Sequence, residues 1–358
     1  MKIIQILVLF AALFCWSCTP RNQPKAGYNF SPIQQKIQSW IDSAYYPGAA
    51  ILIAKDNEVI WEEYFGNYGP DTVVFIASAG KWLAAATVAA VVEEGKLSWN
   101  DPVQKWLPEF TDLKGNATLK QLFSHTAGYP DYQPKGQRRD DYQTLSESVK
   151  NILPLPIDTT PGAIFYYGGL AMQVGGRMAE LAAGKDFERI FQEKIAQPLG
   201  MENTHFTPVD LGGGHSPMVG GGARSTLHDY AHFLEMIANG GMYRGKRILQ
   251  KSSIQEMQAD QVGKAKVFSG EFVEKARDKK HTGIYGLGEW REVLNGKGEA
   301  VLLSSPSWAG AYPWIDRETG VYGFFITHVN VEVANPAGFS SFYASPALAM
   351  MVRDILGK

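Results

Sequence analysis

Cysteine is nearly absent from this chain of 358 residues. The two cysteines, Cys15 and Cys18, both lie within the first 18 positions. The rest of the chain therefore has no pair of thiols that could form a disulfide, whatever its compartment. A chain of this length does not need such a link, because it can bury a large apolar core.

An excess of charge and several common site signatures are absent as well. The 34 Lys and Arg residues nearly balance 36 Asp and Glu, for a formal net charge of -2, which gives no support to nucleic acid as a partner. No Gly-x-Ser-x-Gly elbow occurs, which argues against an α/β-hydrolase. The glycine clusters at 212–214 and 220–222 are not followed by Gly-Lys-Ser/Thr, so a phosphate loop is not indicated.

The sequence gives little support to a metal site. His228 and His232 have the spacing of a zinc-binding helix, with Asp229 where a metalloprotease has glutamate. Zinc proteases of that type need the glutamate and a third ligand, so an ordinary surface helix is the better interpretation. We therefore expect neither a metal nor an organic cofactor.

One hydrophobic run stands out, at residues 1–18, where Lys2 is followed by apolar residues that end at small ones. The run is too short to span a membrane comfortably and is typical of an export signal. Ser17-Cys18 resembles a bacterial lipoprotein cleavage site, which would leave Cys18 lipidated at the new N-terminus; plain secretion is the alternative. Residues 19–30 are predicted to be a polar tether. We expect an exported, periplasmic protein anchored to the membrane through Cys18.

The most informative stretch runs from Phe75 to Gly95 and is rich in alanine after Gly80. Its composition predicts a helix that is buried on all sides and stopped by Gly95. Ser78 and Lys81, three residues apart at its start, would share one face, so that the amine could reach the hydroxyl. The free N–H groups of a helix start could also stabilise an oxyanion. Taken alone, the pair could equally be a helix cap and a solvated lysine.

Strands are predicted near both ends of the chain and helices between them. Ser31-Pro32 starts the first helix in the preferred way, and strands at 49–54 and 58–65 follow as a hairpin. The mixed-charge run at 263–282 is interpreted as a solvated surface insertion. Further strands are predicted at 285–293, 300–303, 312–316 and 321–329, further helices at 118–123, 170–183, 186–195 and 227–239, and a final helix after the cap Ser345-Pro346.

This order of elements predicts an α+β fold. One antiparallel sheet would be built from both termini, with flanking helices and an inserted, mostly helical region. We expect a single folded domain at residues 31–358. The groove between the sheet and the insert is the natural place for a site.

Several segments, in order, resemble the serine β-lactamase-like hydrolases, a family that includes class C β-lactamases, penicillin-binding DD-peptidases, D-aminopeptidases and family VIII carboxylesterases. The resemblance covers residues 33–355 and implies a β-lactamase/transpeptidase-like fold and hydrolysis of a small ester, lactam or peptide through an acyl-enzyme. The segments that carry it are FIASAGKWLAAATVAAVVEEGKLSWNDPVQKWLP, TLKQLFSHTAGYPDY, PGAIFYYGG, QPLGMENTHF, GGGARSTLHDYAHFLEMIANGG and YGLG.

The resemblance assigns roles to individual residues. Ser78 would be the acylated nucleophile and Lys81 its partner in proton transfer. Spacing places the tyrosine of the second motif at Tyr167 rather than Tyr166, and Tyr167 would share the role of general base. Gly169 stands where the family often has an asparagine that holds the substrate amide and the lysine, so recognition of a β-lactam side chain is placed in doubt. His125 matches a histidine that is structural in the family.

The third motif of the family is identified at Trp308-Ala309-Gly310, which would bind substrate beside the nucleophile. The backbone N–H groups of Ser78 and Ala311 would form the oxyanion hole. An indole at Trp308 cannot bind a carboxylate as the lysine of the lactamases does, which favours esters as substrates. A nearby arginine could replace that lysine, so β-lactams and D-amino-acid peptides remain the second choice. A slow or non-hydrolytic penicillin- or peptidoglycan-binding protein is the alternative of another class. The oligomeric state is left open.

Overall fold

The computed structural model describes residues 27–130, 144–157, 159–206, 218–268 and 283–357. The predicted signal at 1–18, Cys18 and all but the end of the tether lie outside the described residues and stay predictions. Within the described ranges, no helix is both long and apolar enough to cross a membrane.

A six-stranded antiparallel sheet is built from both ends of the chain, as predicted. β1 (Gly48–Lys55) and β2 (Glu58–Gly66) form the expected hairpin. β1 also pairs with β13 (Val321–His328), so the two ends of the chain meet in the middle of the sheet. The order is completed by β12 (Gly310–Asp316), β11 (Ala300–Ser304) and β10 (Trp290–Leu294).

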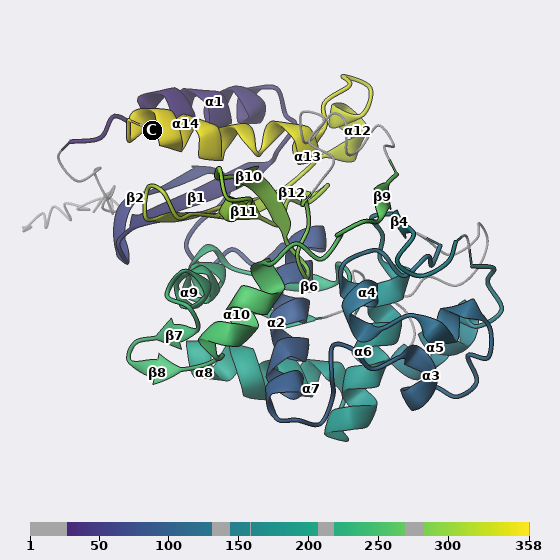
Figure 1. Cartoon of the computed structure of the whole chain (residues 1–358). Coiled ribbons are helices and arrows are strands. Elements are labelled where there is room, and N and C mark those ends of the chain that lie inside the picture. The colour runs from purple at the N-terminus through teal and green to yellow at the C-terminus, as the bar shows by residue number, and fades with distance from the viewer. Residues whose placement is uncertain (1–26, 131–143, 158, 207–217, 269–282, 358) are drawn as a thin grey trace, which may run out of the picture.

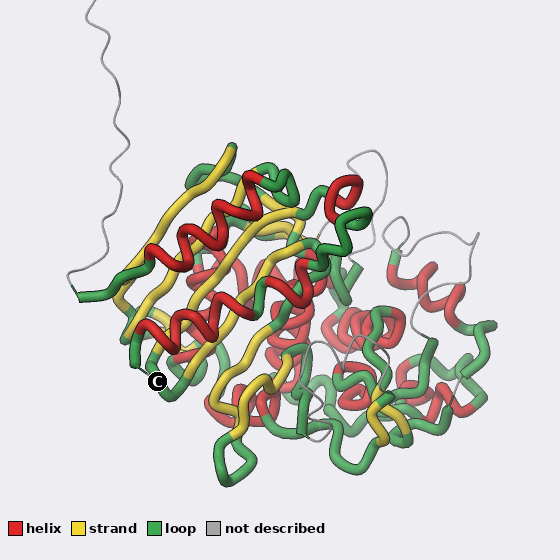
Figure 2. Tube along the Cα trace, turned by 90° about the horizontal axis from the view of Figure 1, so that it is seen from above, coloured by secondary structure: helices red, strands yellow, loops and turns green. Residues whose placement is uncertain are grey.

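Helices cover both faces of this sheet (Figure 1). α1 (Ser31–Asp42) and α14 (Ala347–Ile355) lie side by side across one face, as Figure 2 shows from above. Ile33, Ile37 and Trp40 on α1 are buried there. On the other face, α9 (Leu227–Ala238) packs against β13, β12 and β1.

The middle of the chain forms the helical region, with α2 (Gly80–Glu93) at its centre. Every residue of α2 from Gly80 to Val91 is buried, because helices and the sheet surround it. The other helices are α3 (Val103–Trp106), α4 (Leu119–Phe123), α5 (Leu145–Ile152), α6 (Leu170–Ala183), α7 (Phe187–Phe191), α8 (Gln197–Leu199) and α10 (Lys251–Gln258), with α12 (Val331–Ala334) and α13 (Ser341–Ala344) before α14.

Short strands connect this region to the sheet. β3 (Val74–Phe75) and β5 (His205–Phe206) both pair with β6 (Ala223–Ser225), which fixes the chain just before α2. The remaining short strands are β4 (Ile164–Phe165), β7 (Met242–Tyr243), β8 (Lys246–Arg247) and β9 (Lys266–Val267).

Three local predictions were wrong. The strand predicted at 285–293 begins only at Trp290, because Gly288 adopts a φ of +77° and the chain bends against α2. Neither of the two predicted serine caps forms: the caps are Phe30 for α1 and Pro346 for α14, with no side-chain hydrogen bond.

The segment predicted as a solvated insertion stays a prediction over most of its length. Its described part contains β9, which pairs in parallel with β4, and its charged part, 269–282, lies outside the described residues.

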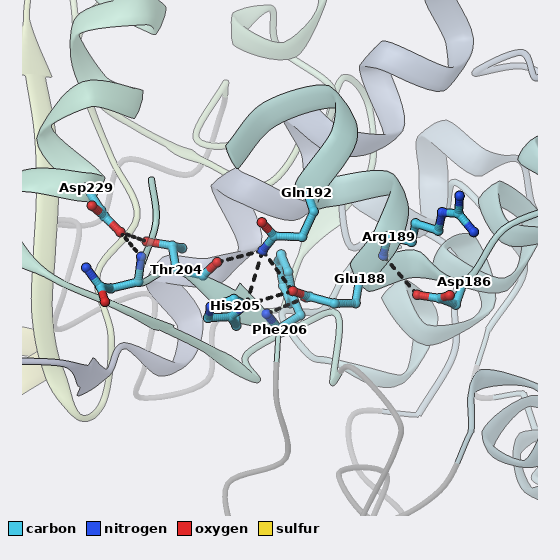
Figure 3. A network of polar contacts seen from close by, with 9 residues as sticks. Asp186, Glu188, Arg189, Gln192, Thr204, His205, Phe206 and Asp229 are labelled. Atoms are coloured by element: carbon cyan, nitrogen blue, oxygen red, sulfur yellow. Dashed lines mark hydrogen bonds and ion pairs between the residues drawn. The ribbon is translucent and has the colours of Figure 1, made fainter. Parts of the chain in front are cut away.

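The residues that suggested a zinc helix have other partners. The Asp229 carboxylate accepts hydrogen bonds from the Asn203 N–H at 2.8 Å and the Thr204 hydroxyl at 2.9 Å, which ties α9 to β5 (Figure 3). His228 Nε2 lies 3.0 Å from a carboxylate oxygen of Glu62 on β2. Among the described residues, no group of three or more His, Cys, Asp or Glu is arranged to hold a metal ion.

The Glu62–His228 pair should make stability depend on pH. Glu62 raises the pKa of His228 above its usual 6.5, although burial opposes this rise. Burial raises the pKa of Glu62, but hydrogen bonds from His228 and Tyr64 outweigh it and bring that pKa below its usual 4.5. The His228 contribution is thus complete below about pH 6.5 and lost as the pH rises through the folded pKa. The Glu62 contribution is complete above about pH 4.5 and lost as the pH falls through its folded pKa.

We therefore expect His228→Gln to destabilise the protein by about 0.5–1 kcal/mol at pH 5.5 and by less at pH 8.5. Urea unfolding at the two pH values measures the difference. His232→Gln is a suitable control, because burial lowers the pKa of His232 instead. If wild type and His228→Gln differed in free energy of unfolding by the same amount at both pH values, the expectation would be contradicted.

Candidate active site

Ser78 lies on a single 3₁₀ turn, Ala77–Ala79, between β3 and α2. The preceding residue, Ala77, has a φ of +44°, a strained conformation for a residue with a Cβ, and strain of this kind collects at functional sites. The Ile76 N–H donates to the Ala223 carbonyl at 3.0 Å and anchors the turn to β6. The turn leaves Ser78 half-exposed while its neighbours are buried. The regular helix therefore starts two residues after the serine.

Lys81 brings its amine to the serine hydroxyl from the first turn of α2. Its Nζ donates to Ser78 Oγ at 3.2 Å, and only 3% of the residue is exposed. The amine also donates to the Gly220 carbonyl. The structure thus brings together the two residues that the sequence placed three apart, and their roles in catalysis stay predictions.

Gly220 is a site residue that sequence analysis missed, although it belongs to the glycine cluster at 220–222. A Cβ on Gly220 would lie 3.1 Å from the Gly169 Cα and 3.6 Å from the Lys81 amine, so glycine allows this close approach. A Cβ on Gly169 would meet no atom within 4 Å. The space expected for an asparagine side chain is therefore open, and a backbone carbonyl holds the lysine.

Tyr167, and not Tyr166, lies beside Lys81. The amine is 4.9 Å from the centroid of the Tyr167 ring. Tyr166 is exposed and packs edge-on against Phe268 at 5.2 Å. The ring of Tyr167 also contacts Trp290, with centroids 5.1 Å apart.

His125 packs against this tyrosine from the interior. Its ring centroid is 4.6 Å from that of Tyr167. Burial, and then the Lys81 charge, hold the pKa of His125 well below 6.5, so the imidazole is neutral. Its Nδ1 accepts from the Gly168 N–H at 3.4 Å, which leaves the proton on Nε2, 3.2 Å from the Tyr285 hydroxyl. His125 is almost fully buried.

The third motif ends at the start of β12. Gly310 has a φ of +116°, and a Cβ there would lie 2.5 Å from Thr327 Cγ2. The pairing of β12 with β13 skips Ala311, whose carbonyl instead accepts from the Ser307 N–H at 2.9 Å. Because the N–H and C=O of one strand residue point to the same side, the Ala311 N–H also faces away from β13.

Ser305, which sequence analysis also missed, connects this region to the nucleophile. Its hydroxyl lies 3.1 Å from the Ser78 carbonyl and 3.3 Å from the Gly288 carbonyl. The turn that approaches Ala311 is therefore held directly against the serine turn. An oxyanion site between the N–H groups of Ser78 and Ala311 agrees with this arrangement and stays a prediction.

Trp308 forms an aromatic wall with two neighbours. The indole is 48% exposed and lies 6.3 Å from Phe75 and 5.8 Å from His328, between ring centroids. Burial lowers the pKa of His328 below 6.5, with the Arg224 charge adding to the effect and a hydrogen bond to Phe75 opposing it, so the ring is neutral at pH 7. The Arg224 guanidinium lies 6.0 Å from the Phe75 centroid. The wall is thus uncharged, with one cation nearby.

Tyr167→Phe is expected to lower kcat on the order of a hundredfold if the phenol transfers protons, since general bases typically contribute that much or more. The substitution keeps the ring contacts with His125 and Lys81, so the melting temperature should hardly change. Tyr166→Phe is the matched control and should retain activity. A loss of less than a few-fold in Tyr167→Phe would place the base elsewhere.

Comparisons with known proteins identify the family and the fold. The β-lactamase family model matches residues 33–338. The crystal structure of a putative β-lactamase from Bacteroides dorei is 53% identical, with a TM-score of 0.88, and the match covers 93% of this chain and 100% of that one. The structure of EstCE1, a hydrolase with promiscuous acyltransferase activity, is 21% identical, with a TM-score of 0.69. The match covers 92% of this chain and 98% of that one. At this identity, the likeness is evidence for a shared fold alone.

Curated relatives include two proteins of Escherichia coli K12. A putative D-alanyl-D-alanine carboxypeptidase is 26% identical over 56% of this chain, and the match spans only 56% of that protein. The D-alanyl-D-alanine-carboxypeptidase/endopeptidase AmpH is 25% identical over 90% of this chain and 87% of its own length. The family model matches most of the length of the present chain. The chain therefore belongs to the β-lactamase family and is a serine hydrolase of β-lactamase/transpeptidase-like α+β fold.

Proposed function

We propose that this serine hydrolase acts on carboxylic esters through an acyl-enzyme at Ser78. Ser78 Oγ attacks the ester carbonyl while its proton passes to the Lys81–Tyr167 pair. The N–H groups of Ser78 and Ala311 stabilise the oxyanion, and the alcohol leaves with the proton. Water then attacks the acyl carbon by the same route and releases the acid. The direct contact between Lys81 and Ser78, at 3.2 Å, supports the first step.

The wall around Trp308 is the observation that carries the choice of esters. Lactam and peptide substrates of the family present a carboxylate to the third motif, where this chain has an exposed indole beside Phe75 and a neutral His328. An uncharged aromatic surface gives no charge-assisted hydrogen bond to a carboxylate. It does favour apolar acyl or alcohol groups, which it can remove from water.

Hydrolysis of D-amino-acid peptides is the second candidate, and a specific observation favours it. The Arg224 guanidinium lies 6.0 Å from the Phe75 ring, within the same aromatic wall, and could receive a carboxylate in place of lysine. The relative AmpH, which matches most of this chain, is named as a D-alanyl-D-alanine carboxypeptidase/endopeptidase. β-Lactam hydrolysis would need the same carboxylate contact.

The test is intact-protein mass spectrometry with three substrates, each with product release followed in parallel. The substrates are a short p-nitrophenyl ester, a penicillin and a peptide ending in D-Ala-D-Ala. We expect fast ester turnover and no lasting penicillin adduct. Peptide cleavage faster than ester cleavage would favour the second candidate. A lasting penicillin adduct with little turnover of any substrate would make the chain a penicillin-binding protein instead.

Trp308→Lys should shift the preference toward carboxylate-bearing substrates. A charge-assisted hydrogen bond contributes about 1.5–3 kcal/mol, so we expect the rate of penicillin acylation relative to ester turnover to rise on the order of tenfold. Trp308→Phe keeps an uncharged ring and serves as the control. An unchanged ratio in Trp308→Lys would remove Trp308 as the basis of the ester preference.

A further inference from the structure

The Ser345 hydroxyl makes a contact that the sequence did not suggest. Ser345 precedes α14 as a helix cap would, yet Pro346 occupies the cap position and no side chain caps the helix. The hydroxyl instead donates to the Gly310 carbonyl at 3.0 Å, across 35 residues of sequence. Only 1% of Ser345 is exposed, so water does not compete for this hydrogen bond. A serine at the start of α14 is thus used to hold the start of β12.

The carbonyl that Ser345 holds belongs to the peptide group between Gly310 and Ala311. A peptide group is planar and trans, so its C=O and N–H point in opposite directions. A hydrogen bond that fixes the Gly310 oxygen therefore also fixes the direction of the Ala311 N–H. Ala311 is skipped in the pairing with β13. The Ser307 N–H holds the Ala311 carbonyl, which belongs to the next peptide group, whereas Ser345 holds the Gly310–Ala311 peptide itself.

Two more buried hydroxyl groups lie behind the same peptide. The Tyr46 hydroxyl donates to Ser341 Oγ at 3.1 Å, and Ser341 and Ser345 are both 1% exposed. Burial raises the pKa of Tyr46 to about 12, with hydrogen bonds to Ser341 and Ser345 opposing the rise, so the phenol keeps its proton.

We propose that Ser345 is a positioning residue for the oxyanion hole: by holding the Gly310 carbonyl, it aims and polarises the Ala311 N–H toward the developing oxyanion. The inference rests on the proposed acyl-enzyme mechanism at Ser78. It extends the site from the nucleophile to the C-terminal helices, because the group that controls the donor lies on the segment between α13 and α14. Ser345 itself does not touch the reacting atoms.

The experiment compares Ser345→Ala with Ser341→Ala. Both remove one hydroxyl from the same buried cluster, and only Ser345 bonds to the Gly310 carbonyl, so Ser341→Ala controls for the structural cost. For Ser345→Ala we expect kcat on a p-nitrophenyl ester to fall about tenfold with KM within about threefold, since the donor is weakened and not removed. For Ser341→Ala we expect kcat to change by less than threefold, with a similar shift in melting temperature.

Infrared spectroscopy distinguishes a misaligned Ala311 N–H from a general loss of structure. The acyl carbonyl of the acyl-enzyme, labelled with carbon-13, absorbs at lower infrared frequency when the oxyanion hole polarises it. We expect Ser345→Ala to move this band to higher frequency and Ser341→Ala to leave it in place. If the acyl carbonyl band had the same frequency in the two variants and their kcat values were equal, the inference would be overturned. Failure of the wild type to acylate at Ser78 would instead overturn the proposed mechanism on which it rests.

Discussion

Replacing Ser78 by alanine is expected to lower ester turnover on the order of 10⁴-fold or more while leaving the protein folded. The structure offers a physical reason for so large an effect. Ser78 Oγ is the hydroxyl that the buried Lys81 amine reaches, at 3.2 Å, on a turn strained at Ala77. Ser78 is only half-exposed and its backbone carbonyl, not its side chain, is the group bound by Ser305. Removing Oγ should therefore cost little stability.

The measurement combines steady-state kinetics with intact mass. Wild type should show an acyl adduct on the peptide that contains Ser78, and Ser78→Ala should show none. Ser39→Ala is a suitable control, since Ser39 is exposed on α1, across the sheet from α2, and its hydroxyl donates to the nearby Lys36 carbonyl. Turnover near the wild-type rate in Ser78→Ala would refute the acyl-enzyme mechanism.

The features predicted correctly depend on local pattern. The hairpin of β1 and β2, the helix α6 at Leu170–Ala183 and the helix α9 at Leu227–Ala238 all follow from alternation or periodicity. The joining of both chain ends in one sheet followed from the order of the elements. Ser78 and Lys81 could be paired because helical spacing brings residues three apart onto one face.

The features missed depend on contacts between distant segments. The Gly220 carbonyl reaches Lys81 across 139 residues, and the Ser305 hydroxyl reaches the Ser78 carbonyl across 227. In both pairs the acceptor is a backbone carbonyl, which every residue carries, so the residue type of the acceptor gives no signal. The predicted cap at Ser345 was wrong for a related reason: its hydroxyl donates to the distant Gly310 carbonyl, and no side chain accepts from the first N–H groups of α14.

Gly288 is also held by a contact between distant segments, and its substitution should have a large effect on stability. The segment around it reads as a strand, but a Cβ on Gly288 would lie 2.4 Å from the Lys81 carbonyl and 2.8 Å from the Ala85 Cβ. Its φ of +77° adds strain for any other residue. The chain just before β10 therefore packs closely against α2 at Gly288.

Gly288→Ala is expected to destabilise the protein by about 3 kcal/mol, from overpacking and backbone strain together, and to lower the melting temperature by about 5–10 °C. Gly296→Ala, on the turn between β10 and β11, is the matched control, because a Cβ there meets nothing within 4 Å and its melting temperature should hold or rise slightly. Activity should fall with stability in Gly288→Ala, since relief of the clash requires α2 to move and α2 carries Lys81. A variant with wild-type melting temperature and turnover would show that α2 can shift without disturbing the Lys81–Ser78 contact, and the close packing of Gly288 would then have no part in holding the site.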